Sequence, residues 1–109
     1  MNDLSQTQYL ELAEQALRAV ESAADAAELD TRRDGSVLNL ELDNGEQVIV
    51  NLQAPLQELW LASKSGAYHF RWRDGRWLDT REGRSFADLL REAVREQGGP
   101  PLPFDASLS

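Results

Sequence analysis

The stretch from Val37 to Leu52 reads VLNLELDNGEQVIVNL, and it predicts a β-hairpin. Leu38, Leu40 and Leu42 alternate with polar residues, which is the period of a strand with one side facing a core. Asn44-Gly45 then supplies the positive φ angles that a tight turn requires, and the chain returns as a second strand. We therefore expect an antiparallel sheet with one apolar and one polar face.

Three further runs after this hairpin have strand character. They cover residues 57–63, 67–73 and about 76–80, and the turn signals Ser65-Gly66 and Asp74-Gly75 separate them. Residues 30–36, before the hairpin, contain no apolar residue, so we expect a connector there. The sequence thus predicts a sheet of about five to six strands.

An amphipathic helix is expected on each side of these strands. The first covers residues 5–27 and the second residues 85–97, each with apolar residues at helical spacing. Ser5 with Gln8, and Ser85 with Asp88, resemble capping boxes at the two starts. Because the sheet must cover its apolar face, we predict an α+β two-layer sandwich with both helices packed on one face.

The length of 109 residues suits one compact domain, which we place at residues 1–97. Gly98-Gly99-Pro100-Pro101 ends the second helix, and residues 98–109 are expected to form a flexible tail in which Leu102 and Phe104 could dock on the helices. No apolar run is long enough to span a membrane, and no secretory signal is visible. We expect a cytoplasmic protein that does not bind membranes.

Composition excludes several kinds of site. The chain has no cysteine and a single histidine, His69, so thiolate chemistry and multi-histidine metal sites are excluded. A net charge of −8 argues against nucleic acid as a partner. Residues 1–58 hold 12 acids and 3 bases, whereas residues 59–109 hold 7 acids and 8 bases. This asymmetry suggests an acidic surface for cations or for a basic partner.

Four acids in the first expected helix share one narrow sector. These acids are Glu14, Glu21, Asp25 and Glu28, at spacings of 7, 4 and 3 residues. Asp30 extends their negative charge beyond the helix. Carboxylate oxygens suit hard cations such as magnesium, calcium, manganese and iron, and they also suit a basic protein surface. The spacing alone fits an ordinary solvated helix face better, so these alternatives stay open.

A second candidate surface is the polar face of the sheet. If Leu59 and Leu61 point inward, the strand period places Trp60 outward, near the amides Asn51 and Gln53. An outward tryptophan among amides is a good anchor for a partner, and it can equally lie flat over its neighbours. His69 is expected on the same face as an ordinary surface histidine.

The sequence resembles a known family at several of these positions. The string NLQAPLQELWLAS (residues 51–63), followed by GAYHF (residues 66–70), is similar to the signature of the frataxin family, of the bacterial CyaY type. The Asp43-Asn44-Gly45 turn and the motif SFADLL (residues 85–90) match as well. The resemblance covers residues 4–97.

Membership would imply a small protein that binds Fe²⁺ and Fe³⁺ weakly and exchangeably through an acidic ridge. The positions that match this ridge are Glu21, Asp25, Glu28, Asp30, Asp43 and Glu46. It would also imply docking on the cysteine desulfurase and on the scaffold protein of iron–sulfur cluster assembly. The matching sheet surface is Asn51, Gln53 and Trp60, and Glu21 and Asp25 would face the partner too.

The resemblance implies an accessory role without enzymatic activity, in a protein that is mostly monomeric and can form iron-induced oligomers. Two alternatives stay open: a weak ferroxidase, and an acidic adaptor of the desulfurase with no physiological role for iron. The sequence departs from the family in its alanine-rich helix end, at residues 23–27, and at Leu52 and Glu58. Many relatives carry further acids at the helix end, a basic residue in place of Leu52 and glutamine in place of Glu58.

Overall fold

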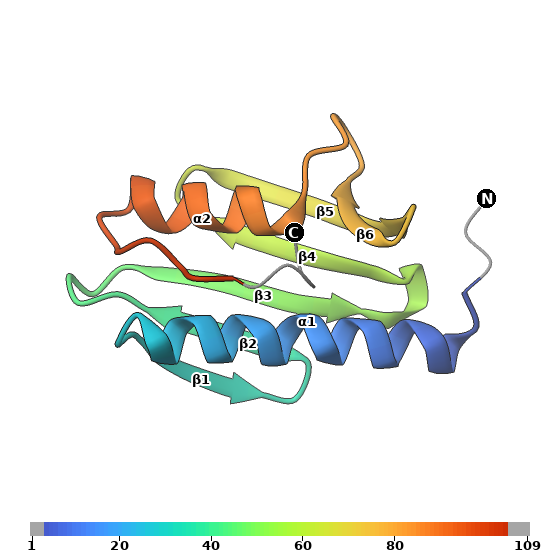
Figure 1. Ribbon diagram of the computed structural model, residues 1–109, viewed down its shortest axis with the longest axis horizontal. Coiled ribbons are helices and arrows are strands. Elements are labelled where there is room, and N and C mark those ends of the chain that lie inside the picture. The colour runs from blue at the N-terminus through green and yellow to red at the C-terminus, as the bar shows by residue number, and fades with distance from the viewer. Residues whose placement is uncertain (1–3, 105–109) are drawn as a thin grey trace.

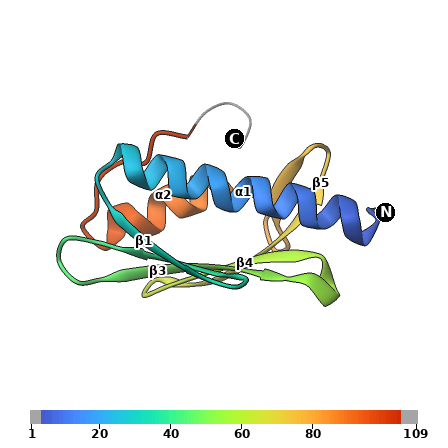
Figure 2. The ribbon, with the colours of Figure 1, turned by 90° about the horizontal axis from the view of Figure 1, so that it is seen from below.

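The computed structural model describes residues 4–104 and shows a two-layer α+β fold. Its six strands form one antiparallel sheet, in which their spatial order is their order along the chain. Both helices cover the same face of this sheet, which confirms the predicted architecture (Figures 1 and 2). The elements are α1 (Gln6–Ala26), β1 (Asp30–Asp34), β2 (Val37–Glu41), β3 (Gln47–Gln53), the 3₁₀ turn η1 (Ala54–Leu56), β4 (Glu58–Ser63), β5 (Gly66–Arg73), β6 (Arg76–Asp79) and α2 (Phe86–Glu96).

The prediction of a connector at residues 30–36 is wrong for most of that segment. Asp30–Asp34 forms β1, an edge strand that pairs with β2 in register from Asp30 opposite Glu41 to Asp34 opposite Val37. Its half-buried residues are Thr31 and Arg33. A strand that turns polar side chains inward carries no apolar alternation, so the hydrophobic pattern cannot reveal it. Charged side chains are also common on edge strands, where they discourage pairing with another chain.

The two helices begin at the residues that their caps predict. At α1, the Gln8 N–H donates to Ser5 Oγ at 3.1 Å and the Ser5 N–H donates to Gln8 Oε1 at 3.0 Å, which completes a capping box. At α2, the Asp88 N–H donates to Ser85 Oγ at 3.2 Å. These bonds satisfy backbone donors that have no partner within a helix.

The core lies between the sheet and the helices. Alternate residues of the central strands point inward and are fully buried, and the apolar stripes of α1 and α2 pack over them. Tyr9 of α1 reaches through this layer, where its hydroxyl donates to the Glu58 carbonyl oxygen at 2.7 Å. The fully buried inward residues of the strands are Leu38, Leu40, Val48, Val50, Leu59, Leu61 and Phe70.

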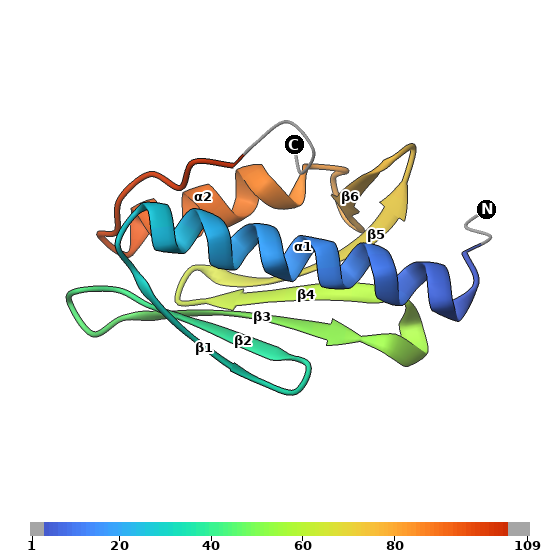
Figure 3. The same ribbon diagram turned by 60° about the horizontal axis from the view of Figure 1, so that its bottom comes forward.

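The segment after α2 folds back along that helix (Figures 1 and 3). Leu102 is buried, Arg91 Nε donates to the Leu102 carbonyl oxygen at 3.2 Å, and the Arg91 guanidinium lies 5.0 Å from the centre of the Phe104 ring. Leu102 and Phe104 thus dock as the sequence allowed. Residues 105–109 lie outside the described part of the chain, so the flexible tail at 98–109 and its boundary stay predictions. Within residues 4–104, neither helix combines the length and the apolar character needed to cross a membrane.

Asp79 organises the loop between β6 and α2. Its buried carboxylate accepts hydrogen bonds from the backbone N–H groups of Arg81 (2.9 Å), Glu82 (2.8 Å) and Arg84 (2.6 Å). Burial alone would raise the pKa of the Asp79 carboxyl, but these three bonds outweigh it and hold the pKa below its ordinary value. The ionised carboxylate therefore stabilises this loop.

Replacing Asp79 with asparagine is expected to lower the free energy of unfolding at pH 7 by about 2 kcal/mol, because the amide cannot accept all three bonds. The folded-state pKa is depressed, so the wild-type stabilisation is complete above the unfolded-state value of about 3.9 and is lost as the pH falls through the folded-state pKa. Urea unfolding at pH 7 and at about pH 3 should show the two proteins converging in acid. Asp74→Asn, at an exposed turn position, is the matched control. A difference that persists unchanged at low pH would contradict this account.

Candidate functional site

The expected metal ligands gather mostly at one end of the molecule. Glu21 and Asp25 lie on the last turns of α1, Glu28 follows it with φ +62°, and Asp30 begins β1. Asp43 lies in the turn between β2 and β3, at the same end of the fold (Figure 3). All of them except the half-buried Glu21 are exposed. Glu14 lies two turns earlier on α1.

Glu14 is already occupied by a cation of the protein. Arg33 of β1 reaches α1, and its Nη2 donates to Glu14 Oε2 at 2.7 Å. The hydrogen bond from Arg33 and the arginine charge lower the pKa of the Glu14 carboxyl. Glu14 therefore differs from the other acids expected as metal ligands, because a metal ion would have to displace Arg33 before it could bind this carboxylate.

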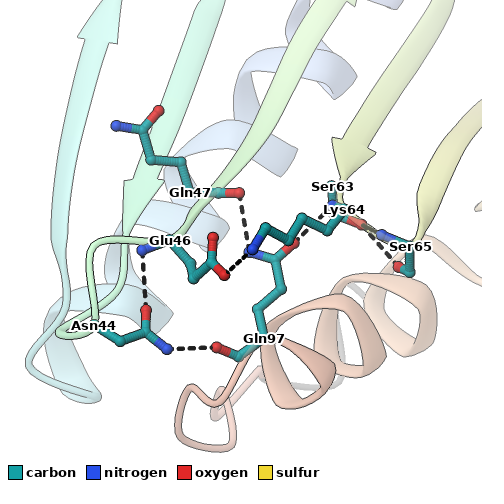
Figure 4. Close-up of polar contacts among 7 residues, drawn as sticks. All are labelled: Asn44, Glu46, Gln47, Ser63, Lys64, Ser65 and Gln97. Atoms are coloured by element: carbon teal, nitrogen blue, oxygen red, sulfur yellow. Dashed lines mark hydrogen bonds and ion pairs between the residues drawn. The ribbon is translucent and has the colours of Figure 1, made fainter.

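Glu46 is occupied in a similar way (Figure 4). Its carboxylate forms an ion pair with Lys64, which lies in the turn between β4 and β5. The buried Gln97 at the end of α2 connects the same two turns: its Oε1 accepts from the Lys64 N–H at 2.8 Å, and its Nε2 donates to the Gln47 carbonyl oxygen at 3.1 Å. Asn44 Nδ2 donates to the Gln97 carbonyl oxygen at 2.7 Å. Glu46 therefore faces a structural junction.

Five of the seven expected ligands have no ion pair with another described residue: Glu21, Asp25, Glu28, Asp30 and Asp43. Because Glu46 is paired with Lys64, only these five of the six positions that match the family's ridge form the acidic ridge of this protein. In the described part of the chain, no three His, Cys, Asp or Glu side chains are close enough together to hold a metal ion as a preformed centre. Exposed carboxylates in this arrangement can attract cations and basic surfaces, with weak coordination by one or two oxygens at a time.

The second candidate surface is the face of the sheet that the helices leave uncovered. Asn51 of β3 lies directly opposite Trp60 of β4, which lies opposite His69 of β5. The rings of Trp60 and His69 stack, with centroids 4.2 Å apart and planes 8° apart. Gln53 lies two residues along β3 from Asn51, beside Glu58. The structure thus brings Asn51, Gln53 and Trp60 together, and both orientations weighed for Trp60 are realised, since it points outward and lies flat on a neighbour.

Sequence reasoning missed the polar centre of this face. Glu58 is buried there, and its carboxylate accepts from Trp60 Nε1 at 2.8 Å and from Arg71 Nε at 2.8 Å. His69 Nδ1 lies 3.8 Å from the same carboxylate. Burial raises the pKa of the Glu58 carboxyl, but the hydrogen bonds from Trp60 and Arg71 and the positive charge of Arg71 outweigh it, so the pKa is lowered overall. The available signal was the register, since Glu58 pairs opposite Arg71 once β4 and β5 are aligned.

Comparison with known proteins places this geometry in a family. Residues 2–100 match the family model described as "Frataxin-like domain". The "Iron-sulfur cluster assembly protein CyaY" of Paraburkholderia phymatum is 48% identical over 101 residues, which cover 91% of this chain and 96% of the relative. The protein of the same name from Burkholderia mallei is 45% identical over 108 residues, which cover 94% of this chain and all of the relative.

Solved structures agree with the sequence relatives. The frataxin of Psychromonas ingrahamii superposes with a TM-score of 0.85 at 29% identity, over 94% of this chain and 99% of that one. The trimeric frataxin of the yeast Saccharomyces cerevisiae, complexed with ferrous iron, superposes with a TM-score of 0.64 at 25% identity, over 88% of each chain. The match of the family model along residues 2–100, together with these relatives, confirms the resemblance: this chain belongs to the frataxin family.

Proposed function

We propose that this protein is an iron-binding accessory protein of iron–sulfur cluster assembly, which docks on the cysteine desulfurase and its scaffold protein. The observation that carries this proposal is the acidic ridge: five carboxylates that pair with no cation of residues 4–104, at one end of a frataxin fold. Relatives named for iron–sulfur cluster assembly, and a neighbouring frataxin complexed with ferrous iron, support it.

The chemistry of the ridge supports weak and exchangeable binding of Fe²⁺ or Fe³⁺. All its donors are carboxylate oxygens, which bind hard cations, and their spread along α1, β1 and the β2–β3 turn offers no closed coordination sphere. An ion held by one or two carboxylates keeps most of its water and exchanges readily. Such binding suits a protein that passes iron on or senses it, and it suits storage poorly.

Docking would use two surfaces. The ridge, Glu21 and Asp25 in particular, would face a basic patch of the desulfurase and would speed the encounter through long-range attraction. The outer sheet face, with Asn51, Gln53 and Trp60, would supply the short-range contact, because half-buried tryptophan and amide side chains are typical anchors of interfaces. Binding there would alter sulfur transfer or the access of iron to the scaffold.

Within this proposal the protein has no enzymatic activity, resides in the cytoplasm and is mostly monomeric, with oligomers induced by iron. A weak ferroxidase and an adaptor without a role for iron are the competing functions. The ferroxidase is rejected if chelated Fe²⁺ is oxidised no faster with the protein than without it. The adaptor predicts that iron leaves the affinity for the desulfurase unchanged.

Removing two ridge charges is expected to remove iron binding. Asp25→Asn with Glu28→Gln should abolish the local broadening that anaerobic Fe²⁺ causes in amide NMR signals of residues 21–30, because neutral amides are poor ligands for a hard cation. Glu82→Gln, which removes an exposed charge from the loop before α2, is the control and should retain the broadening. Finding no localised broadening in the wild-type protein would reject the iron site.

Freeing Glu46 should extend the iron site. Lys64→Gln removes the cation that pairs with Glu46, so the turn between β2 and β3 should bind Mn²⁺ several-fold more tightly. Paramagnetic broadening around Asp43 and Glu46 measures this affinity. Arg95→Gln changes the net charge equally at an exposed position of α2 and should leave the turn unaffected. Equal effects of the two substitutions would show that only the net charge matters.

Truncating Trp60 should weaken docking on the desulfurase–scaffold complex. Trp60→Ala removes the ring that stacks on His69, and loss of such an anchor commonly costs about 2 kcal/mol, or roughly 30-fold in affinity. Calorimetric titration of the complex with and without Fe²⁺ measures the effect and the influence of iron together. Leu10→Ala, at an exposed position of α1, is the control. Unchanged affinity in Trp60→Ala would reject the sheet face as the docking surface.

A further inference from the structure

Two arginines of β5 point to the uncovered face of the sheet. Arg71 and Arg73 are two residues apart on this strand, on the same side as His69 and opposite to the buried Phe70. Arg71 uses only its Nε, toward Glu58, so its two terminal nitrogens have no hydrogen-bond partner among the described residues. Arg73 has no side-chain hydrogen bond or ion pair within residues 4–104. These donors are free for an external acceptor.

Glu58 holds the Arg71 side chain in place through the arginine Nε, which leaves the terminal nitrogens exposed to a ligand. The Glu58 carboxylate that binds Arg71 Nε through one oxygen binds the Trp60 indole N–H through the other. Because Glu58 is buried and bonded on both sides, it joins the arginine and the aromatic stack into one unit. An acceptor that binds the terminal nitrogens of Arg71 therefore requires little further ordering of that side chain.

A depression of about 260 Å³ lies beside this unit, and it is lined by Glu58, Arg71, Arg73, Leu78, Asp79 and Thr80. Its two carboxylates are already satisfied: Glu58 by Trp60 and Arg71, and Asp79 by three backbone N–H groups. The groups left free to bind a ligand are the two guanidinium groups and the Thr80 hydroxyl. The depression therefore offers hydrogen-bond donors and positive charge, in a protein whose net charge is −8.

We propose that this depression binds a carboxylate from an acidic segment of a protein partner, whose neighbouring residues cover the Trp60–His69 stack. This inference deepens the proposed function, because it names the charge that a partner of the sheet face carries at β5. A carboxylate matches the planar end of Arg71 with two parallel hydrogen bonds. The adjoining stack offers apolar area that a free inorganic anion would leave unused.

The charges at the two edges of the sheet restrict how a partner can be oriented on the uncovered face. The acidic ridge lies toward β1, at one edge of the sheet, whereas Arg71 and Arg73 lie on β5, next to the opposite edge strand. A partner that spans the face must therefore be basic where it meets the ridge and acidic where it meets β5. Turned by 180°, the same partner would place like charges together, which disfavours that orientation. A nucleic acid, negative throughout, meets repulsion at the ridge.

The test is an NMR titration of the full chain with an acetylated hexaglutamate peptide. We expect saturable shifts of the Arg71 and Arg73 Nε–H signals and of the Trp60 indole N–H. Arg73→Gln, a substitution at an exposed position, should weaken binding about tenfold, Arg73→Lys should retain part of the affinity, and added salt should weaken it. Arg95→Gln on α2 is the matched control and should bind as the wild type does.

Three results would overturn the inference. The first is shifts spread evenly over all arginines, and the second is equal weakening by Arg73→Gln and Arg95→Gln. The third is binding of inorganic phosphate or of a hexauridylate as tight as that of the peptide, which would assign the depression to phosphate groups. The titration contains neither iron nor desulfurase, so its failure leaves the proposed function standing, and failure of the iron tests leaves this one unaffected.

Discussion

Burial of one face of the sheet under two helices is the constraint on which the rest of this structure depends. The inward residues of β2, β3 and β4 lose their contact with water only because α1 and α2 lie over them, and the free energy of this burial is the main source of stability in a domain of this size. Two helices cover only one face. The other face is left to polar and aromatic residues, and this is where the Trp60–His69 stack and the buried Glu58 lie.

The same constraint explains which features could be predicted from the sequence. Wherever a residue faces the core, its neighbours show the period of the element, so the central strands and both helices follow from the alternation around Leu38–Leu42 and from the stripe that includes Leu17 and Val20. Edge strand β1 lacks that signal, because Thr31 and Arg33 occupy its inward positions. Its existence depends on pairing with β2, which is a tertiary contact.

The acidic residues of the candidate site could be predicted from the sequence, but the ion pairs that some of them form could not. The sequence places Glu21, Asp25 and Glu28 in one sector of a helix. The structure keeps Glu21 and Asp25 on α1, whereas Glu28 lies beyond the end of the helix with φ +62°. It does not reveal that Arg33 comes from β1 to Glu14, or that Lys64 comes from another turn to Glu46, because these partners are 19 and 18 residues away along the chain. The contact of Glu58 with Arg71 likewise requires the register of β4 and β5. Only the folded chain shows which acids are free to act.

The contacts of Gln97 can form only late in synthesis, because this residue follows all of its partners in the chain. Its side chain and carbonyl group bind Gln47, Lys64 and Asn44, which precede it by 50, 33 and 53 residues. During synthesis the β2–β3 turn, which holds Asp43 and Glu46, and the β4–β5 turn, which holds Lys64, leave the ribosome well before α2. Gln97 cannot join these two turns until α2 has formed. The segments that form the sheet hairpins therefore leave the ribosome before the segment that joins the two turns. The last helix of the chain thus supplies the contacts that join the two turns beside the acidic ridge.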